Sequence, residues 1–389
     1  MNAGQTVFSQ LMDFLPTYEF DRCVGRYRGN HRVREFSCRD QFLCMAFAQL
    51  TYRESLRDIE TCLRSMGHKL YHCGFRATMA RNTLAKANEN RDWRMYADLA
   101  GVLIARARQL YVNEPIGVEL EQTIYAFDST TIDLCLTLFP WAQFRRRKSA
   151  VKLHTLIDLR GNIPCFVHIS SGAMADVTSL DLLPIEAGAF YVMDRGYTDF
   201  ERLYRFTQCL AFFVTRAKRD LDFLRRDYRQ VDKATGLRSD QSIMLCGPKT
   251  CKRHPVPLRR ISYYAADIDK RFVFLTNNFV LPALTIAQLY RCRWQVELFF
   301  KWIKQHLRIK AFFGTSQNAV KTQVWIAISI YVLVAIIKKE LRIQRPLSEI
   351  LQILSITLFE KVHMAQALTE TELQSSQGAC HNQLLLFHL

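Results

Sequence analysis

Three acidic residues carry the strongest chemical signal in this sequence of 389 residues: Asp128, Asp194 and Glu297. Asp128 follows the apolar run Ile124–Phe127 and Asp194 follows Phe190–Met193, so each carboxylate is predicted to project from the end of a strand. Carboxylate oxygens are ligands that Mg²⁺ prefers, and two such ions can hold both oxygens of a phosphodiester during its displacement. A single aspartate after a strand is more often a turn or cap residue, so neither aspartate is a strong signal by itself. The third acid of a metal site would come from a helix.

A polar stripe surrounds Glu297, on a segment predicted to form one long helix from Ile286 to Leu307. Four residues on it are spaced by three, four and seven positions: Tyr290, Arg293, Glu297 and Lys304. At 3.6 residues per turn these spacings return close to one face. The stripe could therefore supply the third acid of a metal site from a helix. A surface ladder of ion pairs explains the same spacing, and spacing leaves both interpretations open.

The composition favours a DNA-binding protein with sizeable cores. Lys and Arg number 53 against 36 Asp and Glu, which gives a formal net charge of +17 and attracts an anionic partner. Hydrophobic residues make up 49% of the chain, and its length fits two or three domains. The twelve cysteines have no regular pairing pattern, which is typical of a reducing compartment. The longest apolar run, Val324 to Ile337, is shorter than the roughly 20 residues of a membrane span. We therefore predict a cytoplasmic protein without a membrane partner.

The pattern along the chain predicts an α+β protein. Residues 1–115 have helical periodicity and are predicted to form an all-α DNA-binding domain. In it, Met79–Asn88 would be a recognition helix that presents Arg81, Asn82 and Lys86, groups suited to phosphates and base edges. A solvated helix surface is the alternative.

Short β-rich runs follow from about residue 120. Three of them are consecutive and are predicted to pair antiparallel: Thr123–Phe127, Lys152–Leu159 and Cys165–Ile169. Two more, Ala189–Met193 and Ala211–Thr215, alternate with helices predicted at Leu180–Glu186 and Asp199–Cys209. We predict a mixed sheet flanked by helices over 120–216 and 278–340, a β-rich insertion over 217–277, and a C-terminal helical segment over 341–389.

The run YRCRWQVELFFKWIK, which contains Tyr290, Arg293, Glu297 and Lys304, resembles the YREK signature of bacterial transposases of the insertion-sequence-four family. The resemblance extends to AFDSTTIDL around Asp128, VMDRGYTD around Asp194 and the KLHTLIDL strand. It implies a ribonuclease-H-like catalytic core in which the three acids bind two Mg²⁺ ions, which Mn²⁺ could replace. It also implies that Tyr290, Arg293 and Lys304 hold a phosphate of the DNA.

The same resemblance implies cut-and-paste transposition by a homodimer that joins the terminal inverted repeats of the element in a synaptic complex and inserts them into target DNA. Relatives pass through a hairpinned end with a flipped base stacked on an aromatic residue of the insertion, and Phe272 is the candidate here. An aromatic residue in a strand is more often core. Two alternatives remain: a ribonuclease-H-like nuclease that cuts without joining strands, and a DNA-binding repressor, which would need one acid lost.

Overall fold

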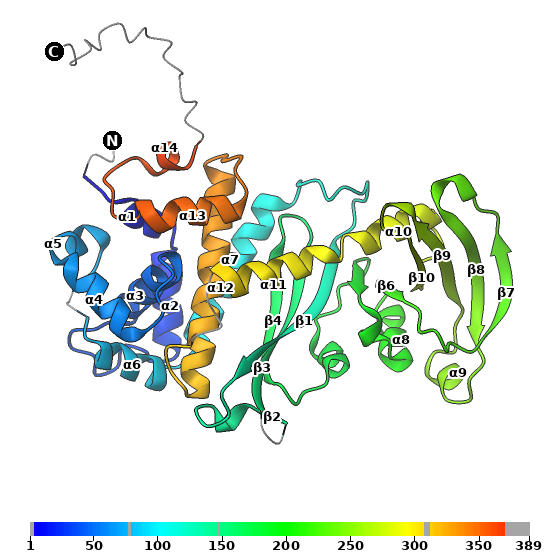
Figure 1. The fold of residues 1–389 in the computed structure, drawn as a ribbon, viewed down its shortest axis with the longest axis horizontal. Helices are drawn as coiled ribbons and strands as arrows, with labels where there is room; N and C mark the ends of the chain where they lie inside the picture. The colour runs from blue at the N-terminus through cyan, green and yellow to red at the C-terminus, as the bar shows by residue number, and fades with distance from the viewer. Residues whose placement is uncertain (1–3, 77–78, 146–147, 307–311, 370–389) are drawn as a thin grey trace, which may run out of the picture.

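The computed structural model describes residues 4–76, 79–145, 148–306 and 312–369 of the chain (Figure 1). Helices fill the N-terminal part, and a long mixed sheet occupies the centre and the far end of the molecule (Figure 1). The N-terminal helices are α1 (Val7–Asp13), α2 (Thr17–Arg26), α3 (Cys38–Leu50), α4 (Leu56–Ser65), α5 (Gly67–Leu70), α6 (Arg81–Asn90) and α7 (Arg94–Tyr111).

Side-chain caps define where two of these helices begin. Ser37 forms a capping box with Asp40 at the start of α3, and the Ser55 hydroxyl accepts from the Asp58 N–H at the start of α4. Because α3 is buried on nearly all sides, it forms the centre of the helical part. A helix is present where one was predicted over Met79–Asn88, but as α6 it begins two residues later, at Arg81, and ends at Asn90.

Ten strands form one mixed sheet, in the order β2-β3-β1-β5-β6-β10-β9-β8-β7, with β4 paired to β3. The strands are β1 (Ile124–Leu134), β2 (Gln143–Arg145), β3 (Lys148–Asp158), β4 (Ile163–Ser171), β5 (Phe190–Met193), β6 (Phe212–Arg216), β7 (Phe223–Arg229), β8 (Leu237–Leu245), β9 (Leu258–Ala265) and β10 (Lys270–Thr276). β1, β3 and β4 pair antiparallel, whereas β5 pairs parallel with both β1 and β6. Strand β5 is apolar and buried at every position, as expected of a parallel strand covered on both faces. This is the predicted α+β, ribonuclease-H-like arrangement.

The β-rich segment after β6 continues the same sheet. Strand β10 pairs antiparallel with β6, and β9, β8 and β7 follow outward. Figure 1 shows these strands at the end of the molecule far from the N-terminal helices. The segment 217–277, predicted as an insertion, therefore lengthens the sheet that carries the candidate site.

Two predicted helices differ from the structure. Residues Leu180–Glu186 do not form an α-helix; a 3-10 helix covers Asp176–Leu182 instead, and Pro184 removes a backbone donor just beyond it. The single helix predicted from Ile286 to Leu307 is also wrong. It is divided into α10 (Ala283–Arg291) and α11 (Trp294–His306) by a turn at residues 292 and 293. The predicted helix over 199–209 is confirmed as α8 (Phe200–Gln208), and α9 (Thr250–Arg253) is a further short helix.

Helix α12 (Gln317–Glu340) is the central helix of the molecule and packs against α3, α6 and α7 (Figure 1). Its length and apolar composition would suffice to cross a membrane, yet 89% of its most apolar stretch is buried inside the protein. A helix that is apolar on all sides and covered by protein is a core helix. The apolar run from Val324 to Ile337 lies within this buried helix, and α13 (Leu347–Thr357) and α14 (Met364–Leu368) complete the described chain.

Candidate active site

The register of the central sheet brings Asp128 and Asp194 together. β1 and β5 run parallel with Phe127 opposite Met193, so the two aspartates occupy the next position on neighbouring strands. Asp194 follows the end of β5, as predicted. Asp128 does not lie at a strand end, because β1 continues to Leu134 in its pairing with β3. The sheet opens at Asp128 because its neighbour β5 stops there.

Arg293 joins Asp128 to Glu297. It lies in the turn between α10 and α11, where Nη1 donates to Asp128 Oδ2 at 3.1 Å and Nη2 donates to Glu297 Oε1. The Arg293 side chain is only 16% exposed. Its Nε–H is buried and has no hydrogen-bond partner among the described residues. The guanidinium group thus retains its Nε–H for a further acceptor.

Tyr290 joins the same group from the last turn of α10. Its hydroxyl donates to Asp194 Oδ1 at 3.2 Å, and its ring packs 4.8 Å from the ring of Phe274. Burial raises the pKa of Tyr290 to about 12, so the hydroxyl stays protonated and donates. Arg216, at the end of β6, lies 4.0 Å from the same Asp194 carboxylate.

The neighbouring acids affect the pKa of Asp128. Burial is the main cause that raises its pKa to about 6, and the charges of Asp194 and Glu297 raise it further. The Ser129 backbone N–H and the Arg293 guanidinium act in the opposite direction. Two like charges that perturb one carboxyl group indicate that the three predicted acids share one neighbourhood.

Carboxylates are the ligand type that a hard divalent cation prefers, and three of them lie around Arg293 and Tyr290. The described side chains, as they stand, contain no group of three acids, cysteines or histidines close enough to hold a metal ion. In this arrangement the guanidinium of Arg293 lies between Asp128 and Glu297. The negative charges of Asp128 and Glu297 favour a cation at this position, and the Arg293 guanidinium is the cation that lies there.

A second polar network lies behind Asp128, and sequence reasoning assigned it no role. The Tyr197 hydroxyl lies 3.5 Å from Asp128 Oδ1. The Ser129 hydroxyl donates to Asp176 at 2.7 Å, and Lys152 forms an ion pair with the same Asp176 carboxylate at 3.1 Å. Tyr197 and Lys152 occur in the quoted motifs, which was the available signal, whereas Asp176 and Arg216 have none nearby.

The other predicted residues lie at different distances from the acids. Lys304 is on α11, seven residues beyond Glu297, which corresponds to about 10 Å along the helix. Phe272 is half-buried on β10, with the Arg216 guanidinium 5.3 Å from its ring centre. The remaining three are exposed on α6, in the N-terminal helical part: Arg81, Asn82 and Lys86.

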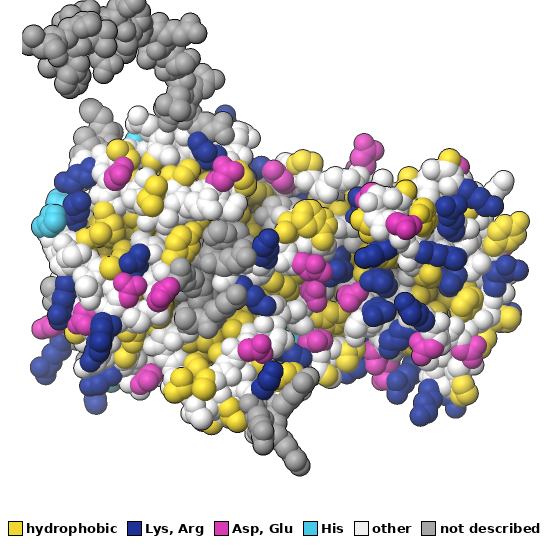
Figure 2. Space-filling model, in the orientation of Figure 1, with side chains coloured by type: hydrophobic (Ala, Val, Ile, Leu, Met, Phe, Trp, Pro, Cys, Tyr) yellow, Lys and Arg dark blue, Asp and Glu magenta, His cyan; other side chains and the backbone are white. Residues whose placement is uncertain are grey.

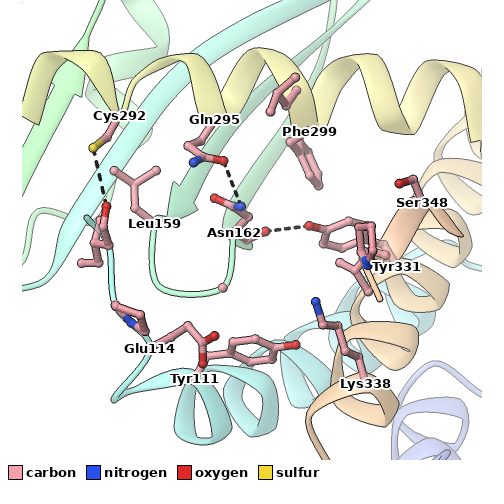
Figure 3. A pocket seen from close by; sticks show the side chains of 16 residues that line it. Tyr111, Glu114, Leu159, Asn162, Cys292, Gln295, Phe299, Tyr331, Lys338 and Ser348 are labelled. Atoms are coloured by element: carbon pink, nitrogen blue, oxygen red, sulfur yellow. Dashed lines mark hydrogen bonds between the residues drawn. The ribbon is translucent and has the colours of Figure 1, made fainter. Parts of the chain in front are cut away.

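A cavity of about 390 Å³ lies on the opposite side of α11 (Figure 3). Cys292, Gln295 and Phe299 face it at spacings of three and four residues, so Glu297 projects from the other face of the helix. Figure 3 shows Gln295 accepting from the Asn162 amide beside this cavity. In the candidate active site, the side chains of Asp194 and Glu297 are 39% and 57% exposed and can be reached from solvent.

Comparisons with known proteins identify the family of this chain. A family model described as a transposase DDE domain matches residues 119–333, and one described as a domain of unknown function (DUF4372) matches residues 3–76. A putative transposase, y4zB, of Sinorhizobium fredii is 32% identical over 72% of this chain and 78% of its own length. A probable transposase for insertion sequence element IS5377 of Geobacillus stearothermophilus is 34% identical over 53% of this chain and 54% of its own.

Among solved structures, a piggyBac transposase synaptic complex with hairpin DNA aligns with 95% of this chain and 81% of its own, at 8% identity and a TM-score of 0.42. The family match covers more than half of the chain and includes all three acids. The chain belongs to the family of transposases with a DDE domain, enzymes that act on DNA in transposition and use divalent metal.

Proposed function

We propose that this transposase moves its element by cut-and-paste transposition, with Mg²⁺-dependent cleavage at the element ends followed by strand transfer into target DNA. The observation that supports this most is the cluster around Arg293, where carboxylates from a strand and a helix meet one guanidinium group. Asp194 is tied to the cluster through Tyr290. The whole group is placed at the point where the sheet opens.

In this proposal Asp128, Asp194 and Glu297 are the catalytic residues and hold two Mg²⁺ ions, or Mn²⁺ in their place. The ions, when bound, activate water or a 3′-hydroxyl and stabilise the leaving oxygen. Asp128 has to be ionised to bind a metal ion, and the Arg293 guanidinium favours the ionised form when no metal is bound.

Tyr290, Arg293 and Lys304 bind a phosphate of the terminal strand. Arg293 would turn from the carboxylates to a DNA phosphate, and its unpaired Nε–H provides a donor for that contact. Such contacts position a strand without selecting its sequence. The YREK signature and membership of the insertion-sequence-four family are part of the proposal.

DNA recognition is assigned to residues 1–115, with Arg81, Asn82 and Lys86 of α6 against the terminal inverted repeats. The catalytic domain comprises 120–216 and 278–340, with 217–277 as an insertion and 341–389 as a C-terminal helical segment. The active form is a homodimer in a synaptic complex, in the cytoplasm. Exposure of the three α6 side chains supports the recognition role.

Phe272 is proposed to stack on a flipped base at a hairpinned end. The Arg216 guanidinium covers one face of its ring, so it has to move aside for a base. Phe272→Ala should slow hairpin formation more than first-strand nicking, whereas Phe272→Trp, which keeps a ring, should retain both. Equal slowing of the two steps by Phe272→Ala would assign the ring to the core.

The alternative is a ribonuclease-H-like nuclease that cuts without joining. One experiment separates the two: incubate the protein with Mg²⁺, a duplex that carries the element ends and a supercoiled target, then map the products. Joined products support transposition by this chain, and cleavage alone supports the nuclease. Asp194→Ala protein is the control for a contaminating nuclease.

A further inference from the structure

One face of the outer sheet, formed by β7–β10, carries a row of arginines. Opposed side chains in an antiparallel pair point to the same side, and alternate residues of a strand share a side. Arg271 on β10 pairs with Tyr264 on β9. Tyr264 lies four residues from Arg260 on the same strand, so the two point to the same side, and Arg260 pairs with Gln241 on β8. Ile243, two residues further along β8, pairs with Arg225.

The Arg238 guanidinium stacks on Tyr264, at 5.2 Å from its ring centre, and so belongs to the same side. We name this surface the arginine face. Its members are Arg225, Arg238, Arg260 and Arg271. Figure 2 shows Lys and Arg side chains gathered over the end of the molecule that holds these strands.

The positive charge of the arginine face is not neutralised by neighbouring acids. Within the described residues, none of the four guanidinium groups forms an ion pair. Arg271 donates to Ser262 Oγ at 2.9 Å and Arg260 donates to Gln241 Oε1 at 3.2 Å, so both use neutral acceptors. Asp269 lies at the rim, where it accepts from the Tyr264 hydroxyl. Partial burial and the charge of Arg271 lower the pKa of Arg260, which reflects the crowding of like charges.

The opposite face of these strands is built differently. There Arg259 and Asp240 form a buried ion pair at 2.7 Å, and Phe272 and Phe274 contact Tyr290 of the candidate active site. On that side the Arg259 charge is paired, and the surface around Phe274 is buried. Because Arg271 and Phe272 are consecutive on β10, they point to opposite sides. The arginine face therefore lies across the sheet from the candidate active site.

We propose that the arginine face binds target DNA, as a duplex of arbitrary sequence, through its phosphates. Four strands at about 4.8 Å spacing cover about 14 Å, which is enough to span either groove of B-DNA. Arginines bound to neutral acceptors keep donors for phosphate oxygens, and release of counterions from the duplex favours the association. The choice of target DNA rests on the proposed function, whereas the phosphate-binding face rests on the register and charge alone.

The test replaces the three exposed arginines together, Arg225→Gln, Arg238→Gln and Arg271→Gln. The control removes the same number of charges elsewhere, Arg202→Gln, Arg205→Gln and Arg253→Gln on α8 and α9, where Arg202 and Arg253 are paired with acids. Binding of a random duplex of about 30 base pairs is measured in EDTA over a range of salt. We expect the arginine-face variant to bind at least about tenfold more weakly, with the slope of log K against log salt reduced by about 2 to 3. The control should change the slope by less than about one.

Equal losses in the two variants, or an unchanged slope in the arginine-face variant, would overturn the proposal. So would an equally large loss for a single strand of the same sequence, since that indicates a general polyanion surface. Thermal unfolding of both variants identifies a loss caused by misfolding, and single substitutions of Arg225 and Arg271 then provide the measurement. Metal chemistry plays no part in EDTA, so failure of end cleavage in Mg²⁺ would affect the proposed function and leave this measurement intact.

Discussion

The Arg293 guanidinium lies 3.1 Å from the Asp128 carboxylate, although 165 residues separate the two in the sequence. The same guanidinium binds Glu297, one helical turn further on. A positive group thus holds two of the three proposed metal ligands before any metal is bound. Metal binding and release of Arg293 are expected to be coupled, because both cations favour the same carboxylates.

Loss of any one acid should separate binding from chemistry. Asp128→Ala, Asp194→Ala or Glu297→Ala should reduce end cleavage by at least about 100-fold, because each removes a proposed metal ligand. End binding should remain within a few-fold, since it depends mainly on the net charge of +17. Cleavage assays and gel-shift titrations at one salt concentration measure the two effects. Parallel loss of both activities would point to misfolding.

Arg293 and Lys304 should each contribute one phosphate contact. Arg293→Ala and Lys304→Ala are expected to weaken end processing and to reduce the salt slope of end binding by about 0.9 each. Arg293→Lys is the matched control, because it keeps the charge and loses the two-pronged geometry. Its salt slope should stay near that of the wild type while processing falls. A wild-type slope in Arg293→Ala would assign Arg293 to an ion-pair ladder alone.

Substitution of α6 should affect recognition and spare chemistry. The triple variant Arg81→Ala, Asn82→Ala and Lys86→Ala should lower the preference for end DNA over scrambled DNA by roughly 10- to 100-fold, since each lost base contact costs about 1–3 kcal/mol. Metal-dependent nicking of unrelated DNA should persist. Competition binding at fixed salt measures the preference. An unchanged preference would move recognition to the catalytic core or the insertion.

His154 should make the fold sensitive to acid. It is buried on β3, with Nε2 2.9 Å from Ser170 Oγ, and burial lowers its pKa to about 4. The unfolded chain takes up this proton below about pH 6.5, so it binds more protons than the native state between pH 6.5 and 4, and stability falls as pH falls. The expected loss between pH 6.5 and 4.5 is about 2 kcal/mol. Urea unfolding at both values, with His154→Gln as the comparison, measures it. The same pH dependence in both proteins would refute the assignment.

Local sequence determined several parts of this protein unaided. The apolar runs before Asp194 and within β3 and β4 predict their strands, because short β-rich stretches bounded by polar turns have few other stable conformations. Ser55 predicts the start of α4, since its hydroxyl satisfies an N–H of the first turn. The three acids and the family motifs can also be recognised from the sequence alone.

Tertiary structure decided what these residues do to one another. The residue spacing predicts that Arg293 lies on a continuous helix. In the structure the helix is interrupted at Arg293, and the guanidinium lies between Asp128 and Glu297. The sheet opens at Asp128 because β5 ends, which depends on the register of a strand more than 60 positions away. The arginine face likewise depends on pairing across four strands. Such relations are set by long-range packing and strand register, which a periodic pattern along one segment does not encode.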